Sequence, residues 1–518
     1  MAIYFANKLC KNGGIAIYVS QKRSIPKYFE RIKELKDRGY ELTNLRTKSD
    51  MNELLRLQKL IFRYYGEESI YSDISKMGIL PHYSSLPSGL RMSVEYAFRK
   101  GKIYTVICTS TLAQGINIPI KYMILTSLNM AQNSLTVRNF QNLIGRTARP
   151  GVYTEGNIII SDSKIYDERK GKRGKFLWRD TEYMFDPNRE EACSSAILSI
   201  VQNIDLTYKF SVDGSMVTEY ICNNISKNWT ASDLFADEKE YEEKYKKDII
   251  SKLNSILQNY RNSVDSIENE ILYVWRLEDG ENTKSINMIS QKICTNSLAY
   301  YLANDEEKKR LSKLFEAMAT DIYSNIDRTN RYAFSMLSPP NIVLILDWIS
   351  SCRLNNQKKT EDELIEQITG LYQSIYTGTD ISFSICRNWI KGKSYFEISQ
   401  TTSLDLFKIE KICNYNLLYQ FCFLVGNVID CLEESVNTEM FMLLQKKIKY
   451  GVDSVTAISI CEKVFNDRML AKDITNILDD KHISNDEIIG FIKMKKEKVS
   501  DYLKDYPIFF QDKIKYLR

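Results

Sequence analysis

Short β-branched runs alternate with helical segments in residues 1–180, and this alternation constrains the fold more than any other feature. The runs that read as buried strands are Ile15–Ser20, Tyr104–Cys108, Tyr122–Thr126 and Ile158–Ser161. Segments such as Pro26–Arg38 and Leu90–Arg99 have the periodicity of connecting helices. This pattern predicts a parallel sheet covered on both faces, with ligands bound beyond the carboxyl ends of the strands. Polar residues that fall at these ends are Ser20, Gln21, Thr109 and Ser110.

Two short segments within this region predict its chemistry, Thr109–Pro119 and Asn142–Gly151. The second places Arg146 and Arg149 three residues apart behind a glycine. On a helix, residues i and i+3 share one face, so both guanidinium groups would reach the same anion. Arginines at this spacing are also common on solvated helices. The two segments together, about 30 residues apart and each joined to a strand-like run, are the more specific signal.

The two segments resemble motifs V and VI of the superfamily 2 helicases of the DEAD/DEAH type. They are most similar to those of the superkiller-type RNA helicases and the archaeal DNA-repair helicases. Residues 15–22 resemble motif IV, which is the first strand of the second RecA-like domain. The stretch that leads into motif V in that group is similar to His82–Pro87 and the residues Arg91, Val94, Glu95, Phe98, Arg99 and Gly101. The resemblance covers about 165 residues, from Ile15 to Asp180.

The resemblance implies a role for individual residues in ATP hydrolysis and strand binding. Arg149 would be the arginine finger that stabilises charge on the γ-phosphate, with Arg146 as its partner. Contacts to the nucleotide would come from Gly115, Asn117, Asn142 and Gly145. Contacts to strand phosphates, which carry no sequence information, would come from Ser20, Gln21, Thr109, Ser110 and Thr111.

Three positions depart from the pattern of these helicases or need a separate reading. Asn142 stands where a glutamine is usual, with Gln141 one step earlier, and Ala148 replaces the glycine between the two arginines. His82 is followed by Tyr83 in place of a second histidine, and we interpret His82 as a buried or hydrogen-bonded residue with no catalytic role.

Two motifs that such helicases need do not occur in the 518 residues. The sequence holds no G-x-x-x-x-G-K-[ST] loop for phosphates and no D-E-A-D or D-E-x-H string for magnesium. The nearest match to the loop, Gly171–Lys175, has the wrong spacing, and Met1 lies only about 14 residues before the first strand. We therefore expect the C-terminal half of an ATP-dependent helicase, with ATP and Mg²⁺ bound through a partner polypeptide that carries the P-loop domain. The alternative is a non-catalytic nucleic-acid-binding or regulatory module, or a truncated gene product.

Charge is distributed unevenly along the chain. Residues 1–180 carry 30 Lys and Arg against 15 Asp and Glu, whereas the remainder carries 41 against 51. No acidic residue lies between Glu95 and Glu155, an interval with seven basic ones. Such a stretch favours a surface that faces phosphates, of single-stranded DNA or RNA or of a nucleotide. A buried α/β core that lacks carboxylates would give the same count.

The eleven cysteines form no C-x-x-C motif and there are only two histidines, so a zinc site is not expected. Apolar surroundings favour reduced thiols and a cytoplasmic protein. The apolar run Leu417–Leu432 is interrupted by polar residues, which predicts a buried helix with no role as a membrane span.

Beyond residue 180 the pattern becomes almost entirely helical, and we predict domains at 1–180, 181–338 and 339–518. Glu238–Leu272 reads as a long exposed helix or a helical hairpin, and Leu337–Pro340 is the strongest breaker. Trp389–Ile398 predicts a helix, a glycine stop and a second helix capped by Ser394. Leu444–Ile474 around Gly451 resembles a helix-hairpin-helix element that binds phosphate, although an ordinary helical hairpin fits equally well.

Overall fold

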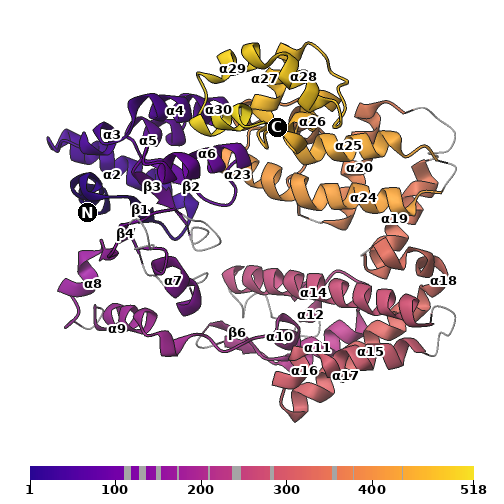
Figure 1. Ribbon diagram of the computed structural model, residues 1–518. Helices are drawn as coiled ribbons and strands as arrows, with labels where there is room; N and C mark the ends of the chain where they lie inside the picture. Colours follow the sequence, from indigo (N-terminus) through magenta and orange to yellow (C-terminus); the bar gives the residue numbers. More distant parts are fainter. Residues whose placement is uncertain are drawn as a thin grey trace.

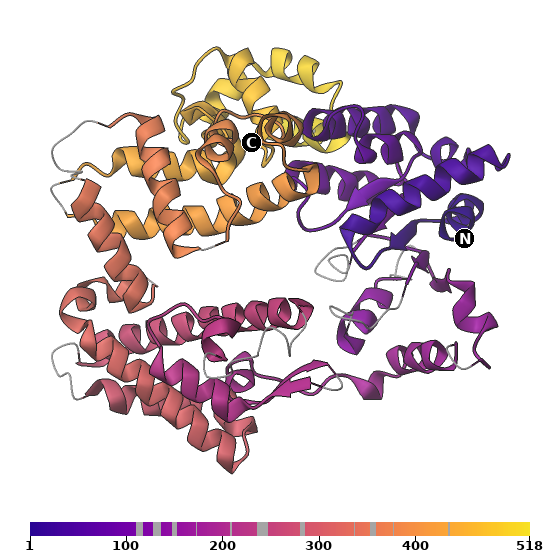
Figure 2. The same ribbon diagram turned by 180° about the vertical axis from the view of Figure 1, so that it is seen from behind.

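The computed structural model describes residues 1–109, 118–127, 136–147, 153–171, 174–207, 210–235, 247–279, 285–335, 337–352, 359–376, 378–433 and 436–517. Figure 1 shows the sheet near the N-terminus, a separate layer of helices below it, and C-terminal helices that return to the sheet. The view from behind in Figure 2 shows the same arrangement. The first and last parts of the chain therefore lie together.

The sheet has five parallel strands in the order β2-β3-β1-β4-β5. The strands are β1 Ile15–Tyr18, β2 Leu80–His82, β3 Thr105–Cys108, β4 Tyr122–Leu125 and β5 Asn157–Ile160. Every residue of β1 and β3 is buried, so both faces of the central strands are covered. This confirms the predicted α/β RecA-like fold, and all four strands predicted from the sequence are present.

The fifth strand, β2, was not predicted. It is only three residues long and contains Pro81, which cannot donate a backbone hydrogen bond. Within the described sheet β2 lies at an edge and pairs with β3 alone, which is where a strand proline is tolerated.

Nine α-helices in the described part of residues 1–185 accompany the sheet. They are α1 Ala2–Leu9, α2 Ile25–Asp37, α3 Asn44–Thr47, α4 Met51–Tyr65, α5 Ile70–Lys76, α6 Ser88–Arg99, α7 Val137–Ile144, α8 Ser163–Asp167 and α9 Gly174–Phe185. Helices α2 and α6 confirm the two connecting helices that the sequence predicted.

The separate layer is built around one long helix, α14, which runs from Lys247 to Asp279. The predicted start of this helix at Glu238 lies outside the described residues. A short antiparallel pair, β6 Ile204–Thr207 and β7 Phe210–Val212, was not predicted, because strand-like alternation is nearly absent there. The remaining helices of the layer are α10 Ala196–Val201, α11 Gly214–Asn223, α12 Ala231–Leu234, α15 Ser285–Asn296, α16 Leu298–Leu302, α17 Asp305–Ser324 and α18 Ile326–Thr329.

The C-terminal helices begin within the predicted breaker Leu337–Pro340, with α19 Pro339–Cys352. They continue with α20 Glu361–Ile375, α21 Phe383–Ile390, α22 Tyr395–Thr402, α23 Leu406–Lys411, the π-helix η6 Ile412–Phe421, α24 Cys422–Cys431, α25 Glu439–Tyr450, α26 Val455–Lys463, α27 Arg468–Leu478, α28 Ile488–Met494, α29 Lys496–Leu503 and α30 Ile508–Lys515. Ser394 caps α22 and Gly392 has a positive φ of 70°, which confirms the predicted helix, glycine stop and capped second helix.

Helices α23, η6 and α24 form one continuous helix, Leu406–Cys431, that crosses the C-terminal part of the chain. Among the described residues it is the only continuous helix long and apolar enough to span a membrane. Its side chains Leu417, Phe421 and Val425 are buried inside the protein, as the sequence predicted for this run. The middle of the helix is a ten-residue π-helix, a form that is rare and often occurs at functional sites.

Polar contacts join the C-terminal helices to the helices of the sheet. The guanidinium group of Arg63 in α4 donates to the Asp473 carboxylate in α27, with 2.9 Å from NH2 to Oδ1. Tyr96 in α6 donates its hydroxyl to Asp512 in α30 over 2.6 Å. Buried tyrosines of α4 and α22 pack at this junction, with ring centroids of Tyr64 and Tyr395 5.6 Å apart.

Candidate functional site

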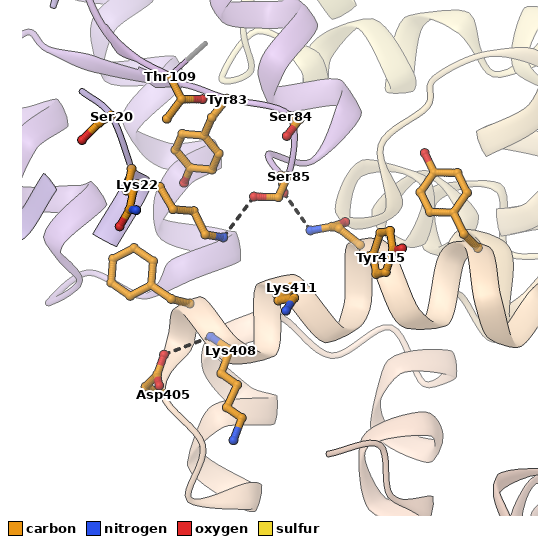
Figure 3. A pocket seen from close by; sticks show the side chains of 14 residues that line it. Ser20, Lys22, Tyr83, Ser84, Ser85, Thr109, Asp405, Lys408, Lys411 and Tyr415 are labelled. Atoms are coloured by element: carbon orange, nitrogen blue, oxygen red, sulfur yellow. Dashed lines mark hydrogen bonds between the residues drawn. The ribbon is translucent and has the colours of Figure 1, made fainter. Parts of the chain in front are cut away.

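A cavity of about 930 Å³ lies between the carboxyl ends of the sheet strands and the helix Leu406–Cys431. Figure 3 shows its two walls, one from the sheet region and one from this helix. The described residues that line it are Ser20, Gln21, Lys22, Tyr83, Ser84, Ser85, Thr109, Asp405, Phe407, Lys408, Lys411, Asn414, Tyr415 and Tyr419. We refer to this cavity as the central cleft.

The sheet wall of the central cleft contains three of the predicted strand-binding residues. Ser20 and Gln21 follow β1, and Thr109 follows β3. The two strands are neighbours in parallel register, with Tyr18 opposite Cys108, so their carboxyl ends bring these side chains to one edge. The prediction that these three residues share one surface is confirmed, while their contact with nucleic acid remains a prediction. Ser110 and Thr111 lie outside the described residues.

The helix wall was not predicted from the sequence. Phe407, Lys411, Tyr415 and Tyr419 follow one another at intervals of four residues, so they lie along one side of the helix. Tyr415 and Tyr419 are exposed, at 55% and 65% of their surface. The segment offered a detectable signal, because basic and aromatic residues interleave from 407 to 419, a pattern that is typical of nucleic-acid surfaces.

Cations and amides accompany these rings. Lys408 forms an ion pair with Asp380, with 2.9 Å between Nζ and Oδ1, and Lys411 is exposed. Asn414 donates its Nδ2 hydrogen to the Ser85 carbonyl oxygen across the cleft, over 2.8 Å. The helix wall is therefore basic and aromatic, and it is tied directly to the sheet wall.

A buried carboxylate, Glu410, lies behind the surface of the central cleft. Its Oε2 is 3.2 Å from the Lys22 Nζ, and its Oε1 accepts a hydrogen bond of 2.7 Å from the Ser85 hydroxyl. The Tyr71 hydroxyl also donates to Oε2, over 3.4 Å. Burial raises the pKa of Glu410 above its ordinary value, although Lys22 and these hydrogen bonds oppose the shift.

A smaller cavity of about 240 Å³ continues from the central cleft and shares Ser84, Asn414 and Tyr419 with it. Arg91 of α6 lines one side, while Lys449 and Tyr450 of α25 line the other. The described lining residues include no Asp or Glu. The path from the central cleft into this cavity therefore favours a polyanion.

The segment that resembles motif VI begins in the last turn of α7, a helix capped by the Thr136 hydroxyl. The helix ends at Ile144, Gly145 and Arg146 form a turn, and Thr147 pairs with Ile120 in an isolated parallel bridge. Arg146 therefore lies in the turn between α7 and this bridge, so the helical spacing considered for Arg146 and Arg149 does not apply to Arg146.

The predicted nucleotide-binding residues are only partly described. Asn142 and Gly145 are exposed and Arg146 is partly exposed, so the end of α7 and the turn after it have the polar and cationic groups that suit an anionic nucleotide. Gln141, the alternative to Asn142, donates its Nε2 hydrogen to the Met184 carbonyl oxygen over 2.9 Å and thereby holds α9. Arg149, Gly115 and Asn117 lie outside the described residues.

Two further sequence interpretations have a structural outcome. His82 is buried and its Nε2 lies 3.0 Å from the Glu95 Oε1, which confirms a hydrogen-bonded histidine. Gly451 is buried against Trp389, and its carbonyl oxygen accepts a 2.9 Å hydrogen bond from the Arg468 Nε. A separate helix, α26, also lies between α25 and α27, so this turn packs as an ordinary helical junction.

Comparison with known proteins places these features in a family context. Residues 46–151 match the family model described as the helicase conserved C-terminal domain. The Hachiman protein HamB of Bacillus cereus is 24% identical over 522 residues, which cover 91% of this chain and 43% of that protein. The ATP-dependent DNA helicase Hel308 of Aeropyrum pernix is 36% identical over 92 residues, 17% of this chain and 12% of the relative. Helicase POLQ-like of Drosophila melanogaster is 38% identical over 88 residues, 17% of this chain and 8% of the relative.

These matches confirm the resemblance to the C-terminal half of superfamily 2 helicases. They support a helicase-type function, which generally involves ATP and nucleic acid. The chain spans less than half the length of the HamB protein that it resembles.

Proposed function

We propose that the chain is the strand-binding C-terminal half of an ATP-dependent nucleic-acid translocase. The observation that carries this proposal is the central cleft, where Ser20, Gln21 and Thr109 face a basic and aromatic helix. Hydroxyl and amide groups on one wall suit backbone phosphates, and exposed rings on the other suit unstacked bases. A single strand presents both groups along its length, which a small-molecule substrate does not.

The proposed strand path runs from the central cleft into the smaller cavity. Lys408 and Lys411 would neutralise phosphates at one end, and Arg91 and Lys449 would do so at the other. One base would stack on Tyr415. Another would stack on Tyr419, which lines both cavities. Because none of these groups reads base edges, we expect binding with little sequence preference. The name of the relative Hel308, an ATP-dependent DNA helicase, favours DNA as the strand.

The proposed nucleotide role rests on the motif VI segment. Arg149 would act as the arginine finger, Arg146 would assist it, and Asn142 and Gly145 would approach the nucleotide, together with Gly115 and Asn117 of motif V. The P-loop and the acidic magnesium-binding segment do not occur in these 518 residues, so a P-loop domain outside them would supply both. ATP supplies the free energy for closing and reopening the two RecA-like domains around the strand.

Two measurements test this proposal. The chain alone should bind a fluorescent single-stranded oligonucleotide, and the affinity should fall steeply as salt is added. An assembly with the P-loop domain should hydrolyse ATP in response to single strand, and Arg149→Ala should abolish this ATPase activity while strand binding persists. A strand-stimulated ATPase that is unaffected by Arg149→Ala would contradict the assigned role.

The second candidate function is a nucleic-acid-binding or regulatory module without catalysis. The same cleft favours it, because this chain alone supplies both walls of the proposed strand-binding site. It predicts the same salt-sensitive binding by the chain alone. The two functions separate in the assembly, where a regulatory module would leave ATP hydrolysis insensitive to Arg149→Ala.

A further inference from the structure

Glu410 is a carboxylate without solvent exposure at the junction of the central cleft with the C-terminal helices. Three donors hold it, and all three belong to the sheet region: the Lys22 ammonium, the Ser85 hydroxyl and the Tyr71 hydroxyl. An ionised carboxylate inside a protein is tolerated only when such partners replace its water. Glu410 thus fastens the helix Leu406–Cys431 to the sheet region through charge.

Lys22 is the charged partner of Glu410, and it also lines the central cleft. Its side chain keeps 23% of its surface exposed, whereas Glu410 keeps none. Its Nζ donates to the Ser85 hydroxyl over 3.0 Å and lies 5.5 Å from the Tyr83 ring centroid and 5.8 Å from that of Phe407. The Lys22 ammonium group therefore lies at the central cleft, while the buried carboxylate of Glu410 neutralises its charge.

A strand phosphate in the central cleft would compete with Glu410 for this ammonium group. Phosphate oxygens are strong acceptors, and they remain solvated on one side, so their pairing with Lys22 needs less desolvation than that of a buried carboxylate. If Lys22 turned toward the strand, Glu410 would retain only the hydroxyls of Ser85 and Tyr71. Burial, and after it the charge of Glu410, raises the pKa of Tyr65, Tyr71 and Tyr83, so these neighbours supply no positive charge to replace Lys22.

We propose that Glu410 is a positioning residue. It keeps the Lys22 ammonium group in an ion pair while the cleft is empty, and this ammonium group pairs with a backbone phosphate instead when a single strand enters. This inference rests on the proposed strand-binding function. Entry of the strand then breaks the ion pair that joins the helix to the sheet region, while the hydrogen bond from Asn414 to the Ser85 carbonyl oxygen persists. By thermodynamic linkage, weakening this ion pair favours strand binding by the same free energy.

The test is a double-mutant cycle on the full chain, read by fluorescence anisotropy with a labelled single-stranded oligonucleotide. Glu410→Gln keeps the shape of the side chain and removes its charge, so Lys22 is free for phosphate and binding should tighten, on the order of fivefold. Lys22→Gln should weaken binding and reduce the salt dependence by about one phosphate contact, a change of about 0.7 in the logarithmic slope for a single strand. The gain from Glu410→Gln should vanish when Lys22→Gln is also present.

Two control variants distinguish the proposed exchange of partners by Lys22 from a general loosening of the folded protein. Glu53 is another buried carboxylate at the junction, where it accepts the Ile508 backbone N–H over 3.0 Å, so Glu53→Gln should not tighten strand binding. Lys76 also has an ion pair, with Asp73, and a ring contact, with Phe62, but does not line the cleft, so Lys76→Gln should leave the salt slope unchanged.

The outcomes distinguish this inference from the function on which it rests. If the wild-type chain binds no single strand at low salt, the proposed function and this inference both fail. If it binds but Glu410→Gln leaves the affinity unchanged or weakens it, this inference alone is overturned. Should Glu410→Gln not fold, an unchanged salt slope in Lys22→Gln overturns it instead.

Discussion

Replacement of Tyr419 by alanine tests the aromatic wall of the central cleft most directly. Tyr419 has 65% of its surface exposed, so its truncation removes little packing from the folded protein. Its ring centroid is 6.4 Å from that of Tyr415 and the planes are inclined by 51°, so the two rings are not stacked on each other. Stacking of one base on an aromatic side chain contributes about 1–3 kcal/mol. Tyr419→Ala should therefore weaken single-strand binding by roughly 5- to 150-fold.

Fluorescence anisotropy with a labelled single-stranded oligonucleotide measures this loss. The matched control is Tyr323→Ala, because Tyr323 in α17 is exposed at 55% and does not line the described cleft. Thermal unfolding should be unchanged for both variants. An affinity of Tyr419→Ala within a factor of about two of the wild type, below the smallest loss that one stacked base implies, would refute the placement of bases on this helix.

The remaining predictions concern stability. Gly451→Ala should lower the unfolding free energy by about 3 kcal/mol or more in urea, because Gly451 has φ +63° and a Cβ would lie 2.5 Å from Trp389. Burial raises the pKa of the Glu268 carboxyl group well above 4.5. Between pH 4.5 and this raised pKa, the folded protein keeps a proton that the unfolded chain releases, so the free energy of unfolding falls as the pH rises. Glu268→Gln should reduce that pH dependence in chemical denaturation, and the remainder comes from other carboxyl groups whose pKa burial also raises, among them Asp321 and Glu410. Ser394→Ala should cost about 1 kcal/mol, because it removes the capping hydrogen bond that the Ser394 hydroxyl accepts from the Glu397 backbone N–H.

Each stability prediction has a control on a similar element. Gly370 lies within α20 with open space where a Cβ would point, so Gly370→Ala should not destabilise. Glu270 is exposed on α14 beside the buried carboxylate, and Glu270→Gln should leave the pH dependence as it is. Ser399 lies inside α22 and does not cap it, so Ser399→Ala should cost less than the cap. Equal effects in a variant and its control would contradict the reasoning for that pair.

The sheet was predictable because local sequence determines its strands. Runs of β-branched residues such as Ile15–Tyr18 are buried on both faces, and this produces continuous apolar stretches that helices do not share. The strand Leu80–His82 escaped prediction because edge pairing with β3, which is remote in sequence, makes it a strand despite Pro81. The turn that holds Arg146 was not predicted for a similar reason, since the bridge from Thr147 to Ile120 is a tertiary contact.

Half of the central cleft was predictable and half was not. Ser20, Gln21 and Thr109 follow strands of one sheet, so topology alone brings them together. Lys411, Tyr415 and Tyr419 reach the same cavity only through packing between segments that are far apart in sequence. Their spacing and the lysines between them indicate a helix face suited to nucleic acid, but the sequence does not show that this face meets the edge of the sheet. The carboxylate of Glu410 was equally hidden, because its donors come from the opposite end of the chain.

The contacts that assemble the central cleft also explain why strand binding should depend on the C-terminal helices as well as on the helicase motifs. The sheet wall offers hydroxyl and amide groups, whose net contribution in water is small for each hydrogen bond. Rings and cations on the helix Leu406–Cys431 add stacking and charge, which contribute more. The helix is held in place by Glu410 and by Asn414, and both of these pair with Ser85 of the sheet wall. A change in the position of this helix relative to the sheet should therefore alter strand affinity, and the proposed exchange at Lys22 would make that position sensitive to the strand itself.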